Sequence, residues 1–82
     1  MNINIINALA DKSRLRILSA LGRGELCACV LPDLVRKTQP TVSSHLKVLH
    51  KAGLVGMRKD GTKRLYSLSP RGKKVIDQIG RW

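Results

Sequence analysis

The stretch that decides the fold is Thr38–Val55, which reads TQPTVSSHLKVLHKAGLV. Its apolar side chains recur at the spacing of one helix face, as expected for a helix packed on a core: Val42, Leu46 and Leu49. Thr38 is a suitable N-cap for this helix, and Gly53 ends it. We therefore predict a helix over Gln39–Lys51 with one buried face.

The opposite face of the predicted helix 39–51 is polar, and its first turn carries hydroxyl and amide groups. Such groups suit the edges of bases in a DNA groove, and the free backbone N–H groups at a helix start suit phosphate. The residues that we expect to contact DNA from this helix are Thr38, Gln39, Thr41, Ser43, Ser44, His45 and Lys47. The alternative is an ordinary solvated face, with His45 capping a buried carbonyl group instead of reaching a phosphate.

A basic hairpin is predicted directly after this helix. Residues 54–59 alternate as a strand does, Asp60 and Gly61 supply a hairpin turn, and residues 63–68 return. Its basic side chains are expected to lie against DNA phosphates or the minor groove: Arg58, Lys59, Lys63 and Arg64. They would also protect an exposed strand edge against aggregation, and both roles can hold together.

Three further helices are predicted before this stretch and one after the hairpin. Their expected positions are residues 1–10, 12–21, 31–37 and 70–82. Asp11 is the expected N-cap of the second helix, and Pro32 falls in the first turn of the third, where its missing N–H costs nothing. The order of four helices, two strands and a helix (ααααββα) predicts a winged helix-turn-helix, mainly α with a two-stranded β-wing, as a single domain over residues 1–82.

The composition agrees with a small DNA-binding domain. The 82 residues carry a net charge of +11, and ten of the sixteen Lys and Arg residues lie within residues 42–82. This charge predicts a surface that binds a polyanion, with a generically basic soluble protein as the alternative. An aromatic content of 2% argues against stacking on single-stranded nucleic acid. Five scattered carboxylates leave little material for acid–base catalysis, so we do not expect an enzyme.

Neither a membrane span nor an export signal is evident. The longest apolar run, Leu26–Leu31, is far shorter than the ~20 residues that cross a bilayer. The N-terminus has no basic region followed by a cleavage site. We therefore expect a cytoplasmic protein with no membrane partner.

Three separated motifs occur in order along the chain: ALADKSRLRIL at 8–18, ELCACVL at 25–31 and TQPTVSSHLKVLHKAGLV at 38–55. Together they closely resemble the ArsR/SmtB family of bacterial and archaeal repressors, over about residues 8–70. The resemblance implies a homodimer that blocks an operator in double-stranded DNA until a metal or metalloid ion releases it. A two-fold dimer would suit a pseudo-palindromic operator.

The effector site is expected at Cys27 and Cys29, which match the Cys-x-Cys pair of the family's arsenic-responsive members. Residues i and i+2 point about 200° apart on a helix but the same way on an extended segment. Since Pro32 places the pair before or astride the start of the third helix, both thiolates could bind one thiophilic ion: As(III) or Sb(III) first, Cd(II) or Pb(II) next. No obligatory cofactor is expected. Two cysteines this close are not expected to form a disulfide, because so small a ring would be strained.

The expected metalloid site departs from the family pattern in two ways. Val30 and Pro32 replace residues of the usual box, including its Asp, and the chain has no third cysteine. A third ligand for trigonal As(III) would therefore come from solvent, a small thiol or the other subunit. The alternatives are that the two cysteines are small buried hydrophobic residues or a reversible thiol redox sensor.

The dimer is predicted from apolar residues at the two ends of the chain, which exceed what one small core can absorb. They are Ile3, Ile5, Ile6 and Leu9 at one end and Val75, Ile76, Ile79 and Trp82 at the other. Pairing of terminal helices about a two-fold axis would cover them. A repressor with redox sensing or no effector, or a sequence-tolerant architectural DNA-binding protein, remains the alternative function.

Overall fold

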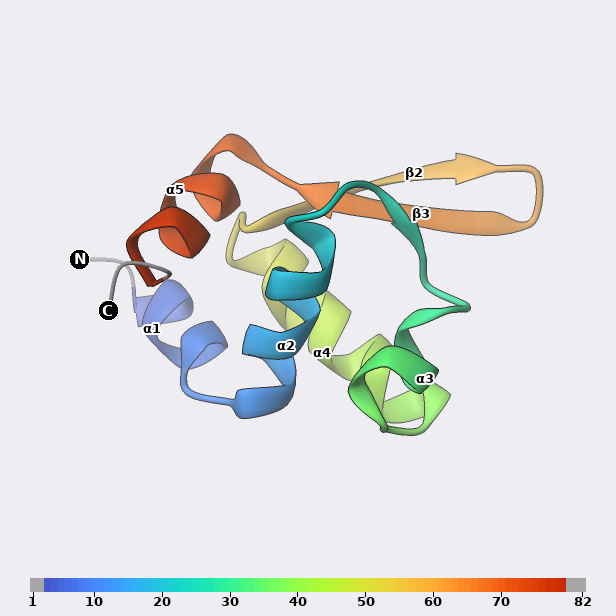
Figure 1. Cartoon of the computed structure of the whole chain (residues 1–82), viewed down its shortest axis with the longest axis horizontal. Coiled ribbons are helices and arrows are strands. Elements are labelled where there is room, and N and C mark those ends of the chain that lie inside the picture. The colour runs from blue at the N-terminus through green and yellow to red at the C-terminus, as the bar shows by residue number, and fades with distance from the viewer. Residues whose placement is uncertain (1–2, 80–82) are drawn as a thin grey trace.

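The computed structural model describes residues 3–79, with side chains from residue 5 onward. Its elements are α1 (Ile3–Leu9), α2 (Lys12–Leu21), β1 (Leu26–Cys27), α3 (Leu31–Val35), α4 (Gln39–Lys51), β2 (Val55–Asp60), β3 (Lys63–Leu68) and α5 (Pro70–Ile79). In Figure 1, α1 and α5 lie at one end of the molecule and the β2–β3 hairpin projects at the other. The predicted winged helix-turn-helix is confirmed. The predicted Trp82 of the terminal apolar stripe and the side chain of Ile3 lie outside the described part.

Helix α4 is the central element of the core. It contacts α1, α2, α3 and β2. The predicted stripe on this helix is buried against residues of the other elements: Val42, Leu46 and Leu49 pack with Ile17, Leu18, Leu31, Val35 and Leu54. The position of α4 is therefore fixed from several sides, and only its polar face is left to solvent.

Side-chain caps fix the residues at which α2 and α4 begin. Asp11 has an extended backbone, and its carboxylate accepts a hydrogen bond of 3.1 Å from the backbone N–H of Arg14. This bond lowers the pKa of Asp11 from its ordinary value. Thr38 caps α4 in the same way, accepting from the backbone N–H of Thr41 at 3.4 Å. The caps confirm both predicted helix starts.

Helix α3 ends at Val35, two residues before the predicted end. Arg36 adopts a left-handed conformation with φ of 57°, and its backbone N–H is bonded to the carbonyl group of Pro32. A left-handed residue after the last turn ends a helix. The short α3 then leads into Thr38 and α4, which gives the compact helix–turn–helix.

Strand β1 is an addition to the order expected from the sequence. It pairs antiparallel with β3, with Leu26 opposite Tyr66 and Cys27 opposite Leu65, so the sheet has the order β1-β3-β2. A strand of two residues is too short to show the alternation of apolar and polar residues by which strands are predicted from sequence. It forms because the outer edge of β3 is available for pairing. Its consequence is that the segment before α3 is bound to the wing.

The start of α5 packs closely on the connection between α4 and β2. The hydroxyl of Ser69 donates to the carbonyl oxygen of Gly53 at 2.6 Å and accepts from the backbone N–H of Gly72 at 3.0 Å. A Cβ atom at Gly72 would overlap the carbonyl oxygen of Leu54. Within residues 3–79, no helix has the length and apolar character needed to cross a membrane.

Gly72→Ala is expected to lower the free energy of unfolding by roughly 1–3 kcal/mol, because the added methyl group collides with backbone that cannot yield. Gly56→Ala is the matched control, since a Cβ atom there meets nothing within 4 Å. Urea unfolding followed by circular dichroism measures both. Equal stability of the two variants would show that α5 is not held against Leu54.

Asp11→Ala is expected to lower the free energy of unfolding by about 1 kcal/mol at neutral pH, because α2 loses its N-cap. The folded-state pKa of Asp11 is depressed, so its stabilisation is present above about pH 4 and is lost as the pH falls through the folded-state pKa. Urea unfolding at pH 7 and at about pH 2.5 should show the difference shrinking in acid. Asp11→Asn, which keeps a capping oxygen, should lose less; a difference independent of pH contradicts the role of the carboxylate.

Candidate nucleic-acid interface

The leading end of α4 presents the predicted DNA-contacting side chains to solvent. Gln39, Ser43, Ser44 and Lys47 are exposed, and Thr41 is half-buried. The side-chain amide of Gln39 donates to the hydroxyl of Ser43 at 3.4 Å. Since the other face of α4 is buried in the core, this end of the helix is the part that can enter a DNA groove.

His45 occupies a different environment from the other predicted contacts on α4. It is half-buried, and its Nε2 lies 3.8 Å from Oδ1 of Asp11, the N-cap of α2. After the hydrogen bond from the backbone N–H of Arg14, the nearby imidazole of His45 is a lesser cause of the lowered pKa of Asp11. His45 therefore contacts a carboxylate instead of the buried carbonyl group that was the alternative prediction, and a role for it at DNA stays a prediction.

The β2–β3 hairpin forms the predicted wing, with one shift at its turn. Asp60 pairs with Lys63, so the loop consists of Gly61 and Thr62, one residue later than predicted. Gly61 has φ of 63°, a left-handed conformation that glycine adopts without strain. The side chains of Lys59, Lys63 and Arg64 are exposed around this loop, as a phosphate-binding wing requires.

Arg58 is the one predicted wing contact that already has a partner within the described chain. Its Nε and Nη2 donate to the two carboxylate oxygens of Glu25 at 2.9 and 2.8 Å. This bidentate pair lowers the pKa of Glu25 and raises that of Arg58. The pair joins the segment before β1 to β2. Sequence reasoning missed it because the two residues are 33 positions apart and carry no local signal.

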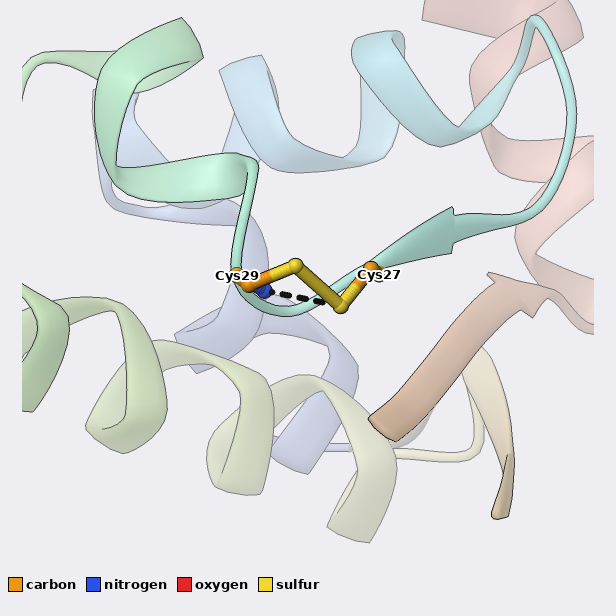
Figure 2. The surroundings of a disulfide bond; sticks show 2 residues. All are labelled: Cys27 and Cys29. Carbon is orange, nitrogen blue, oxygen red and sulfur yellow. Dashed lines mark hydrogen bonds between the residues drawn. A yellow bond between two sulfur atoms is a disulfide. The ribbon is translucent and has the colours of Figure 1, made fainter. Parts of the chain in front are cut away.

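The cysteines lie at the end of β1 and in the turn that leads to α3, as Figure 2 shows. Cys27 ends β1, and the chain then turns, with the backbone N–H of Val30 bonded to the carbonyl oxygen of Cys27 at 3.1 Å. The expectation that no disulfide forms is wrong: Cys27 and Cys29 are disulfide-bonded. The turn brings their Cα atoms to 5.2 Å, which is within the ordinary range for a disulfide.

The short separation of the two cysteines also bears on whether both could bind one thiophilic ion. In the reduced state, neighbouring sulfurs on one loop supply two soft ligands, which fits such an ion. Cys27 is half-buried and Cys29 is exposed, so an ion can reach them. Residues 3–79 contain no cluster of three or more His, Cys, Asp or Glu side chains, so a third protein ligand is not at hand.

A cleft of about 390 Å³ joins the cysteine loop to the start of α4 and to the hairpin. Its lining consists of Cys27, Ala28, Cys29, Gln39, Thr62, Lys63 and Arg64. The backbone N–H of Ala28 donates to the carbonyl oxygen of Arg64 at 2.9 Å, which holds the loop against β3 near the tip of the wing. The cysteines therefore lie beside both the first residue of α4 and the tip of the hairpin.

Comparison with known proteins gives consistent matches. A family model described as "Bacterial regulatory protein, arsR family" matches residues 11–56. The chain is 43% identical to an uncharacterized HTH-type transcriptional regulator of Methanocaldococcus jannaschii, covering 92% of this chain and 86% of that protein. It is 49% identical to an arsenical resistance operon repressor of Staphylococcus aureus, covering 92% and 69%.

Solved structures share the fold. HlyU from Vibrio cholerae superposes with a TM-score of 0.87 at 32% identity, covering 96% of this chain and 87% of that chain. A homodimeric winged helix-turn-helix DNA-binding domain from Mycobacterium bovis, Mb0332, superposes with a TM-score of 0.86 at 27% identity, covering 94% and 72%. With the exposed end of α4 and the basic wing, these matches show that the chain belongs to the ArsR family of bacterial regulatory proteins, which are DNA-binding transcriptional regulators and not enzymes.

Proposed function

We propose that the protein is a dimeric repressor that leaves its operator when Cys27 and Cys29 bind a thiophilic metalloid. The observation that carries this proposal is the cleft in which the cysteine loop meets the first residue of α4 and the wing. The Staphylococcus aureus relative, an arsenical resistance operon repressor, supports As(III) or Sb(III) as the first candidates, with Cd(II) or Pb(II) next. The protein would act in the cytoplasm.

The DNA-bound state would use α4 in the major groove and the wing on the flanking backbone. Two copies related by a two-fold axis would place their α4 helices roughly 34 Å apart, on successive major grooves of a pseudo-palindromic operator. Apolar side chains on the terminal helices support this pairing, because Ile6 is 47% exposed and Val75, Ile76 and Ile79 on α5 are only half-buried. The homodimeric Mycobacterium bovis domain has the same fold.

Effector binding would act through the loop that contains the cysteines. A metal ligand must be a thiolate, so the Cys27–Cys29 disulfide has to be reduced before an ion can bind. Capture of the ion by both thiolates would then set the conformation of the loop, which continues directly into α3 and is bonded to β3. Since α3 packs on α4, the two reading helices would lose the spacing that matches the operator.

A second candidate function, release of DNA on oxidation, is favoured by the disulfide itself. Cys29 is exposed, so an oxidant can reach it. Formation of the Cys27–Cys29 bond would constrain the same loop that the ion constrains. The two candidates differ in which chemical agent triggers release.

Cys27→Ser and Cys29→Ser are each expected to leave DNA affinity within about twofold of the unmodified protein and to abolish release by As(III). The reason is that one remaining thiolate cannot chelate the ion. Fluorescence anisotropy of a labelled operator fragment, with reduced protein at fixed salt, measures both properties.

Parallel titrations of the same complex with As(III), Sb(III), Cd(II) and hydrogen peroxide separate the two candidate functions. Release by a metalloid but not by peroxide supports the first candidate. Release by peroxide alone supports the second. Release by As(III) that survives in both single variants would exclude the cysteine pair as the effector site.

Lys59→Ala is expected to weaken DNA binding uniformly across sequences and to reduce the slope of log affinity against log salt by about one, because one phosphate contact is lost. Lys74→Ala is the control, since this exposed lysine lies on α5 at the far end of the molecule from the wing. Anisotropy titrations at several salt concentrations give the slopes. An unchanged slope for Lys59→Ala would show that the wing does not contact phosphate.

A further inference from the structure

We infer that the cleft beside the cysteines is a binding site for a small thiol that carries a carboxylate group, and that this molecule supplies the third sulfur ligand to As(III). The inference rests on the proposed function and names the co-ligand of the same site. It starts from an incomplete ligand set: the chain has two cysteines, and residues 3–79 offer no cluster of three metal-binding side chains. Trigonal As(III) bound to Cys27 and Cys29 therefore has one open position.

The partner subunit is a poor source of the missing ligand. The terminal helices proposed to form the dimer, α1 and α5, lie at one end of the molecule, and the cysteine loop lies near the wing at the other (Figure 1). In two subunits paired through α1 and α5, the two cysteine loops would therefore lie on the sides turned away from the shared helices. The third donor must then be a molecule that enters the cleft from solvent.

The lining of the cleft indicates the chemistry of that molecule. Beyond the cysteine loop it consists of an amide, a hydroxyl and two cations, from Gln39, Thr62, Lys63 and Arg64, and it includes no acidic residue. Within the described chain, the side chains of Lys63 and Arg64 make no hydrogen bond or ion pair. Two cations and an amide that border one space, with no carboxylate among them, favour an anionic group such as a carboxylate. A volume of about 390 Å³ is sufficient for a small molecule.

The binding step needs no oxidant or reductant once the protein is in its dithiol form. Three thiols, two from the protein and one from the small molecule, replace the three hydroxyl groups of arsenous acid. Three As–S bonds form and three As–O bonds break, and each thiol proton leaves with a hydroxyl group as water. Arsenic stays in the +3 state throughout. The carboxylate of the small molecule takes no part in the exchange and serves only to hold it against the two cations.

This site would make the effector and DNA compete for the same side chains. Gln39, Lys63 and Arg64 line the cleft and are also predicted to contact DNA. A carboxylate bound to Lys63 and Arg64 would neutralise part of the wing and occupy the space beside the start of α4. Because binding of either ligand removes contacts of the other, linkage requires that each lowers the affinity of the other by the same factor.

Native mass spectrometry of the DNA-free protein tests the inference directly. The protein is reduced with a phosphine, which is then removed, and is mixed with As(III) and increasing concentrations of one thiol. Glutathione carries carboxylates and a thiol, 2-mercaptoethanol has no carboxylate, and S-methylglutathione has no free thiol. We expect a complex of protein, As(III) and glutathione that forms at a concentration of thiol at least about tenfold lower than the corresponding 2-mercaptoethanol complex, and no complex with S-methylglutathione.

Lys63→Gln and Lys59→Gln form a matched pair, because both remove one wing charge but only Lys63 lines the cleft. Lys63→Gln should remove most of the preference for glutathione, and Lys59→Gln should keep it. Binding of As(III) to the two cysteines with no preference among thiols, or equal loss in both variants, would overturn the inference and leave the proposed function standing. Failure of the reduced protein to bind As(III) with any thiol would overturn both.

Discussion

The structure depends on the burial of one face of α4. Val42, Leu46 and Leu49 are inserted among residues of α2 and α3, and each fully buried side chain of this kind contributes roughly 1.5–3 kcal/mol. The stripe fixes the rotation of the helix about its own axis. With that rotation fixed, the polar face of α4 is the face exposed to solvent. The packing that stabilises the protein therefore also orients the residues that are expected to contact DNA.

The pairing of β1 with β3 is the second contact that organises the molecule. It attaches the loop of Cys27 and Cys29 to the wing through backbone hydrogen bonds, including that from Ala28 to Arg64. The same loop runs into α3, which packs on α4. Under the proposed function, a change in the bonding of the cysteines would therefore act on both α4 and the wing through directly bonded neighbours, without a long path through the core.

The pair of Glu25 and Arg58 belongs to the same arrangement. An exposed ion pair contributes little to stability, because water and salt screen it and two long side chains must be held in place. Its effect is geometric: two parallel hydrogen bonds span the sheet from the segment before β1 to β2. Arg58 is thereby paired with Glu25, while the side chains of Lys59, Lys63 and Arg64 stay without such a partner in the described chain.

The sequence alone determined the winged helix-turn-helix, the caps at Asp11 and Thr38, the buried stripe of α4 and the position of the cysteines before α3. Helix periodicity, capping and turn residues are local properties, readable wherever a segment is long enough to show a pattern. Only the tertiary structure decided that β1 exists, that Glu25 pairs with Arg58, that His45 faces Asp11, and that the cysteine pair is bonded and borders the wing. These contacts join short segments distant in the chain or depend on the path of one turn, so they arise only when packing brings the partners together.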